Sequence, residues 1–195
     1  RDAQESRGLG DVYKRQACGM VKTVMIVGGQ RKNLPFFWLA EFPGTERGKM
    51  YCQINAGGLY GLQSYVAQVE VDISKGLPCF DMVGLLDSEV REARERLRVS
   101  LHHINAALPA EKITVNYSPA GIVKSGTSFD LPTALVILAA QGKVPPERLR
   151  ELWAVGEVGL DARIKQVRGV LAMLHAANQS AFRSYLIPFE NLGEG

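Results

Sequence analysis

The stretch Ile113–Val144, ITVNYSPAGIVKSGTSFDLPTALVILAAQGKV, organises the rest of this chain. Its first three residues are a β-branched run that predicts a strand, and a loop rich in proline, glycine and serine follows. The segment Leu131–Ala140 has no charged residue, and a helix that is apolar on all sides belongs inside a domain. We therefore expect the core helix here, with Asp130 as N-cap, Pro132 in the first turn and Gly142 at its end.

An amphipathic helix is predicted before this stretch, from Ser88 to Ala107, with Asp87 as N-cap and Glu89 in the first turn. Apolar residues recur at spacings of three and four and form one stripe: Val90, Ala93, Leu97, Leu101, Ile104 and Leu108. The opposite face interleaves both signs of charge and includes Glu92 and Arg96 at the i,i+4 spacing. Such a face could contact DNA or a neighbouring subunit, but interleaved charge is typical of a solvated face, which we favour.

Predicted strands lie on both sides of these helices. Three of them are expected to form an antiparallel meander: Tyr51–Ala56, Tyr65–Ile73 and Cys79–Val83. After the core helix, the pattern predicts a helical turn, two strands joined as a hairpin, a helix and a last strand: Pro146–Arg150, Leu152–Val158, Arg163–Val167, Gly169–Asn178 and Tyr185–Ile187. The whole is an α+β domain, a mixed sheet with helices on one face.

The first residues differ from the rest. Residues 1–16 include SRGLGDVYKRQ, which resembles the translation of a sequencing adapter, so we exclude them from the fold and expect no structure there. Residues 17–49 hold a short strand-like run at Lys22–Gly29 but no periodicity. We expect this second segment to be translated upstream sequence, with Met50 as the native start.

Charge and cysteine content limit the function classes. Residues 1–49 carry nine Lys/Arg and five Asp/Glu, whereas residues 50–195 carry fourteen and fifteen, a net charge of −1. This balance argues against strong nucleic-acid binding by the folded part. Cys18, Cys52 and Cys79 show no CxxC spacing, which is typical of a reduced, cytosolic compartment. No apolar run is long enough to cross a bilayer.

Three motifs carry a family resemblance: GLPCFDMVGLLDSEVREARERLR (Gly76–Arg98), SPAGIVKSGTSFD (Ser118–Asp130) and VGEVGLDARIKQVRGVL (Val155–Leu171). In sequence and in order they resemble the N-terminal domain of the ComM/YifB family, bacterial AAA+ ATPases related to magnesium chelatase. The positions that match the family motifs are Gly76, Pro78, Gly84, Glu89, Gly126, Phe129, Asp130, Pro132, Gly156 and Gly169. The resemblance implies one domain over residues 50–195 with the fold of ribosomal protein S5 domain 2, which the Lon proteolytic domain shares.

The resemblance also implies a function for the parent protein. It would assemble as a ring, expected to be a hexamer, and hydrolyse ATP with Mg²⁺ to move DNA, as a helicase in branch migration during natural transformation. The ATPase module is not in this sequence: GTERGKM (Gly44–Met50) has one residue too few between its glycines, and Met where a phosphate loop needs Ser or Thr. We expect truncation before that module, with no cofactor in this domain, whose task would be to contact neighbouring subunits or DNA.

A Ser/Lys protease is the enzymatic alternative. Ser128 falls where the resemblance to Lon places the nucleophile, whose hydroxyl needs a neighbouring base. The Lon base is a lysine at the start of the helix after the hairpin, and the matching position here is Leu171, which cannot accept a proton. Lys124 and Lys165 do not match the motif. We therefore predict vestigial protease-like positions and no catalysis by this domain.

No metal site is predicted. His102 and His103 are adjacent and would point about 100° apart on a helix, and His175 is alone. A stand-alone nucleic-acid-binding module and a magnesium chelatase component remain as further alternatives to the ATPase domain.

Overall fold

The computed structural model describes residues 24–27, 51–180 and 182–193. The predictions for residues 1–16, and for most of 17–49, lie outside the described residues. The rejected phosphate-loop candidate, Gly44–Met50, lies wholly outside them as well. The strand expected within Lys22–Gly29 is present as β1. In chain order the elements are β1 (Val24–Val27), β2 (Tyr51–Tyr60), β3 (Gln63–Ser74), β4 (Cys79–Val83), α3 (Ser88–His103), β5 (Lys112–Ser118), α4 (Asp130–Ala140), α5 (Pro146–Leu149), β6 (Leu152–Ala154), β7 (Glu157–Val158), β8 (Ile164–Lys165), α6 (Val170–Asn178), β9 (Ser184–Pro188) and a 3₁₀ helix (Phe189–Gly193).

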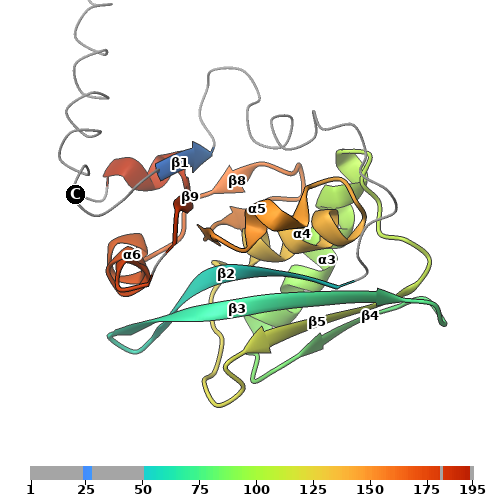
Figure 1. Ribbon diagram of the computed structural model, residues 1–195, viewed down its shortest axis with the longest axis horizontal. Coiled ribbons are helices and arrows are strands. Elements are labelled where there is room, and N and C mark those ends of the chain that lie inside the picture. Colours follow the sequence, from blue (N-terminus) through green and yellow to red (C-terminus); the bar gives the residue numbers. More distant parts are fainter. Residues whose placement is uncertain (1–23, 28–50, 181, 194–195) are drawn as a thin grey trace, which may run out of the picture.

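Among the described residues, the main sheet has seven strands in the order β1-β9-β6-β2-β3-β5-β4. The part formed by β2, β3, β5 and β4 is seen in Figure 1. β2 pairs antiparallel with β3, and β3 pairs antiparallel with β5. The predicted meander is wrong for its third strand, because β4 lies beyond β5 and pairs with it in parallel. The cause is α3, which connects β4 to β5: two neighbouring strands joined through a helix run in the same direction. The predicted α+β class with a mixed sheet is confirmed.

The predicted core helix is confirmed as α4, in which every residue is buried. It packs on β2 and β3, in which every second side chain faces α4. These side chains are almost fully buried and include Ile54, Ala56, Val69 and Val71. α3 packs beside α4 through the predicted apolar stripe, so both helices share one face of the sheet (Figure 1).

α6 covers the opposite face of the sheet. Its Met173 and the strand residue Trp153 pack where Gly57 leaves room, because a Cβ at Gly57 would lie 2.4 Å from the Trp153 ring. Gly57 and Trp153 alternate along their strands with Ala56 and Ala154, which face α4. The expectation of helices on one face therefore holds for α3 and α4, and α6 departs from it.

The predicted strand Leu152–Val158 is divided in the structure. β6 ends at Ala154, and β7 pairs antiparallel with β8 in a separate two-stranded sheet, which confirms the hairpin. The break falls at Gly156, where a Cβ would lie 3.1 Å from both Leu131 and Ile164. The chain turns here because this close contact seats the hairpin against the first turn of α4, and the Leu131 N–H donates to the Gly156 carbonyl.

Candidate functional site

A cavity of about 800 Å³ opens where α3, α4 and α6 begin. Its walls are the first turn of α3, the loop 125–128 before α4, the hairpin residue Glu157 and residues 166–168 before α6, with Leu59 of β2 and Met173 completing the lining. Each of the three sequence motifs reaches this cavity, so it is the candidate site.

The loop 125–128 is attached to β2 by serine hydroxyls. Ser128 Oγ donates to the Gly57 carbonyl at 3.0 Å, and Ser125 Oγ donates to the Leu59 carbonyl at 3.4 Å. Ser128 is 7% exposed. The Ser128 hydroxyl therefore donates its hydrogen bond to a backbone carbonyl, which anchors the loop but is too weak a base to remove the proton and activate the hydroxyl as a nucleophile.

Neither Leu171, the position that matches the Lon lysine, nor Lys124 supplies a base for Ser128. Leu171 is in the first turn of α6, 54% exposed and outside the cavity lining. Lys124 is fully buried, and its Nζ donates to the carbonyls of Pro119 and Ile122, the latter at 2.8 Å. Burial lowers the pKa of Lys124, but its ammonium serves to hold its own loop.

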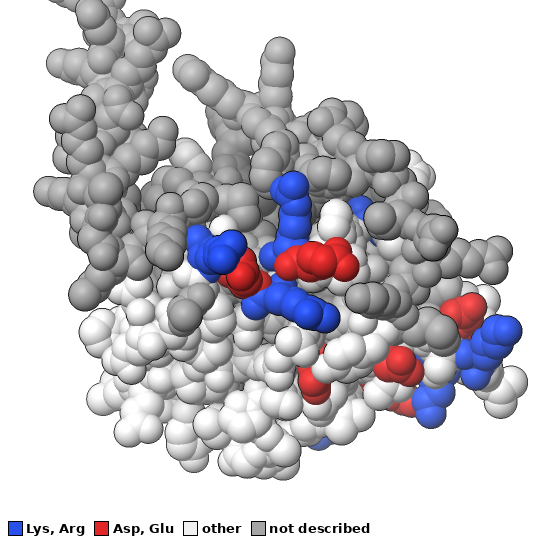
Figure 2. All heavy atoms as spheres, viewed as in Figure 1, with Lys and Arg blue, Asp and Glu red and all other residues white. Residues whose placement is uncertain are grey.

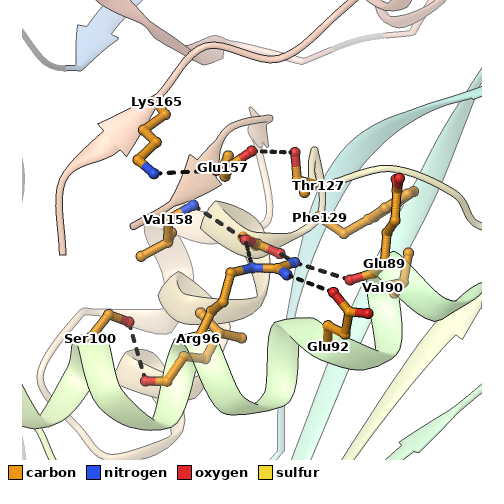
Figure 3. A network of polar contacts seen from close by, with 12 residues as sticks. Glu89, Val90, Glu92, Arg96, Ser100, Thr127, Phe129, Glu157, Val158 and Lys165 are labelled. Carbon is orange, nitrogen blue, oxygen red and sulfur yellow. Dashed lines mark hydrogen bonds and ion pairs between the residues drawn. The ribbon is translucent and has the colours of Figure 1, made fainter. Parts of the chain in front are cut away.

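Asp130 connects three elements at the back of the cavity. Its carboxylate accepts two hydrogen bonds from Arg96 of α3, at 2.9 and 3.0 Å, and one from the Val158 N–H of β7 at 3.3 Å (Figure 3). Arg96 also donates to the Glu89 carbonyl at 3.0 Å. The prediction of Asp130 as N-cap is wrong: Phe129 is the N-cap of α4, and it makes no side-chain cap bond.

Burial decides the electrostatics of this pair. It raises the pKa of Asp130, and the Arg96 guanidinium counteracts the shift by favouring the charged carboxylate. Asp130 in turn raises the pKa of Arg96. The prediction of a solvated charged face is wrong for Arg96, whose side chain is only 20% exposed, because its partner lies across the helix interface. The predicted Glu92–Arg96 contact is confirmed at 3.8 Å.

A second set of contacts fixes the hairpin wall. Thr127 Oγ1 donates to the Glu157 carboxylate at 2.8 Å, and Lys165 Nζ lies 3.5 Å from the same carboxylate (Figure 3). The loop before α4 and the β7–β8 hairpin are therefore held together across the cavity floor.

The structure gathers only some of the motif residues at the cavity. Glu89 and Gly126 line it, and Gly169 stands at its edge as the N-cap of α6, with φ 73° and Leu59 Cδ1 2.5 Å from where its Cβ would lie. Behind it lie Phe129, Asp130, Pro132 and Gly156. Away from it lie Gly76, Pro78 and Gly84.

Sequence reasoning missed Arg96, Ser125 and the β2 edge at Gly57 and Leu59. The one available signal was the Gly57–Gly58 pair, since glycine inside a strand marks a close approach. Within the described ranges, no three His, Cys, Asp or Glu residues gather to hold a metal ion. No helix in the same part of the chain is long and apolar enough to span a membrane.

Charges of both signs lie side by side on the face shown in Figure 2, and an uncharged area adjoins them. The described residues on this face therefore form no continuous basic surface of the kind that follows a nucleic-acid backbone.

Comparisons with known proteins agree with these motifs. The sequence profile of the family described as subunit ChlI of Mg-chelatase matches residues 69–191. Competence protein ComM of Haemophilus influenzae and the protein YifB of Escherichia coli are each 37% identical over 134 residues, which is 69% of this chain and 26% of theirs. Lon protease 2 of Bacillus subtilis is 33% identical over 79 residues, 40% of this chain and 14% of that protein. The chain thus spans about a quarter of the length of ComM and YifB.

Proposed function

This chain belongs to the ComM/YifB family of proteins related to the ChlI subunit of Mg-chelatase, and from that premise we propose that it is a non-catalytic positioning domain of an AAA+ ATPase. The parent protein would be a cytoplasmic homo-oligomeric ring, a hexamer, that uses ATP and Mg²⁺ in its nucleotide-binding module to move DNA. The relative named as a competence protein supports branch migration of transforming DNA as the process.

The observation that carries the proposal is the match of 134 residues to ComM and YifB. The match to the ChlI family profile, over residues 69–191, includes all three motifs. The chemistry of the cavity supports the non-catalytic part. Ser128 donates its hydroxyl hydrogen bond to a backbone carbonyl, and Leu171 offers no base. A domain with this arrangement can hold and orient partners, and nucleotide and Mg²⁺ would bind outside it.

The test uses the complete reading frame from which the chain comes. The encoded protein should hydrolyse ATP faster with forked DNA and should separate its strands. Deleting residues 51–193 should impair strand separation and ring assembly, measured by mass photometry, far more than basal ATP hydrolysis. Unchanged strand separation after the deletion would refute a positioning role, and absence of ATP hydrolysis by the complete protein would refute the ATPase assignment.

The similarity to Lon protease 2 favours a second candidate, a Lon-like protease. Cleavage of fluorescein-labelled casein by the chain, abolished by Ser128→Ala, would establish it. We expect no cleavage by the unchanged chain. Restoring a lysine with Leu171→Lys should also give none while Ser128 Oγ stays bonded to the Gly57 carbonyl.

A further inference from the structure

We propose that the cavity binds an extended, basic segment of a protein, which accepts a backbone hydrogen bond from the outward N–H of Leu59 on β2. The inference goes beyond the positioning role, because it names a ligand class for a specific site. It rests on the hydrogen-bonding edge of a strand, on the cavity beside that edge and on the charges that line it.

The hairpin geometry determines which backbone groups of β2 face outward. Gly61 and Leu62 form a two-residue turn, with Gly61 at φ 60°, so Tyr60 and Gln63 are a hydrogen-bonded pair. Antiparallel pairs alternate between bonded and non-bonded. The N–H and C=O groups of Gly57 and Leu59 therefore point away from β3, which agrees with the serine hydroxyls found on their carbonyls.

The neighbouring strand covers only part of this edge. β6 pairs with β2 at Asn55 and Ala56 and then leaves the sheet. Beyond that point the hydroxyls of Ser125 and Ser128 satisfy two carbonyls, but they are placed to donate and take no bond from the Leu59 N–H. No acceptor for that N–H is found among the described residues. The Leu59 N–H is therefore one unpaired backbone donor beside the cavity, and a carbonyl of an extended segment of another chain can accept its hydrogen bond.

The charges beside this edge select a basic ligand. The cavity is lined by the carboxylates of Asp87, Glu89 and Glu157 and by one cation, Arg168. Asp87 caps α3, and Glu157 bonds Thr127 and Lys165. Glu89 is exposed in the first turn of α3, and within the described ranges its carboxylate has no hydrogen bond or ion pair. It is placed to pair with a Lys or Arg of the bound segment, whereas a nucleic-acid phosphate would be repelled.

The binding test uses four mixtures of acetylated hexapeptides, each with one fixed central residue, Lys, Glu, Leu or Ser, and all other positions randomised. Amide chemical shifts of the ¹⁵N-labelled 195-residue chain report the site. The lysine mixture should shift Leu59, Gly126 and Arg168 and should bind roughly fivefold more tightly than the glutamate mixture. If no mixture at millimolar concentration shifts these resonances, or if the glutamate mixture binds as well, the proposal is overturned.

Two matched pairs of variants measure separately what the Leu59 N–H and the Glu89 carboxylate contribute to peptide affinity. Leu59→Pro removes the N–H that faces outward, which a strand edge tolerates, and should weaken lysine-mixture binding about three- to tenfold relative to Leu59→Ala, which keeps it. Glu89→Gln should weaken binding about two- to fivefold, whereas Glu147→Gln, also in the first turn of a helix but outside the cavity, should not.

Circular dichroism melting confirms that each variant is folded, and should Leu59→Pro unfold, the glutamate pair and the chemical shifts decide the proposal. Equal affinities within both pairs would contradict it. Peptide binding needs neither ATP nor a ring, so its failure and the failure of the proposed ATPase function are distinguishable.

Discussion

Two aspartates begin the two long helices and act in different ways. Asp87 precedes α3, and its Oδ1 accepts the Val90 N–H at 2.9 Å, as an N-cap does. Asp130 is the first residue of α4, and its carboxylate reaches Arg96, 34 residues earlier in the chain, and Val158, 28 residues later. The first bond closes within one turn, whereas the second set joins three elements.

The difference follows from what surrounds each helix start. α3 begins at the cavity mouth beside exposed residues, so its cap carboxylate remains near water. α4 begins inside the domain, where Asp130 is fully buried and needs a charged partner. One sequence signal, an aspartate before an apolar run, therefore leads to a local cap in one place and a tertiary ion pair in the other.

The largest expected effect comes from Arg96→Met. It leaves a buried carboxylate with only the Val158 N–H, and a broken buried pair costs about 3–5 kcal/mol of unfolding free energy at pH 7. Urea unfolding followed by circular dichroism measures it. A loss below about 1 kcal/mol would mean that the pair contributes no more than a surface contact.

The pH dependence of that loss sharpens the comparison. Burial raises the pKa of Asp130, so the folded chain binds this proton more tightly than the unfolded chain. Stability from the protonated group is fully present below the unfolded pKa and is lost as the pH rises through the folded pKa. Arg96→Met should raise that pKa further, so its deficit should grow by about 1–2 kcal/mol between pH 4 and pH 7. A deficit independent of pH would contradict this account.

A smaller effect is expected at the local cap. Asp87→Ala removes one bond to an N–H of the first turn and should lower the unfolding free energy by about 1 kcal/mol. Ser88→Ala, at the exposed neighbour, is the control and should change it by less than about 0.5 kcal/mol. Equal losses of unfolding free energy in Asp87→Ala and Arg96→Met would contradict the distinction between a local helix cap and a buried ion pair that joins three elements.

The smallest effect is expected at Glu92→Gln. Glu92 contacts Arg96 at 3.8 Å, but its side chain is 71% exposed, so removing its charge should cost less than about 0.5 kcal/mol. Thermal melting at two salt concentrations suffices to measure it. A loss comparable to that of Arg96→Met would assign the stabilising role to the surface contact.

Sequence reasoning captured what short-range patterns encode. The stripe of α3, the Asp87 cap and the uncharged α4 all follow from spacings within one helix. The position of β4 could not be predicted, because strand order depends on how α3 crosses the sheet. The division of the predicted strand Leu152–Val158 into β6 and β7 could not be predicted either, because the break depends on the packing of Gly156 against α4.

The candidate site was predicted less completely than the fold. The motifs predict Glu89 and Gly126 as family positions and Ser128 as a protease-like position, each separately. That all three line one cavity follows from the fold and was not predicted. Arg96 was placed with the solvated charges, since its partner is distant in the chain and spacing alone cannot pair them. The unpaired N–H of Leu59 depends on where β6 leaves the sheet, which no local pattern records.

A double-mutant cycle on Arg96 and Asp130 tests most directly the claim that a buried ion pair ties α3, α4 and β7 behind the cavity. The unfolding free energies of Arg96→Met, Asp130→Asn and the double variant are measured at pH 7. We expect a coupling energy of about 2 kcal/mol, because the double variant no longer buries an unpaired charge. Losses that add to within about 0.5 kcal/mol would show that the two side chains stabilise the fold independently and would contradict the account.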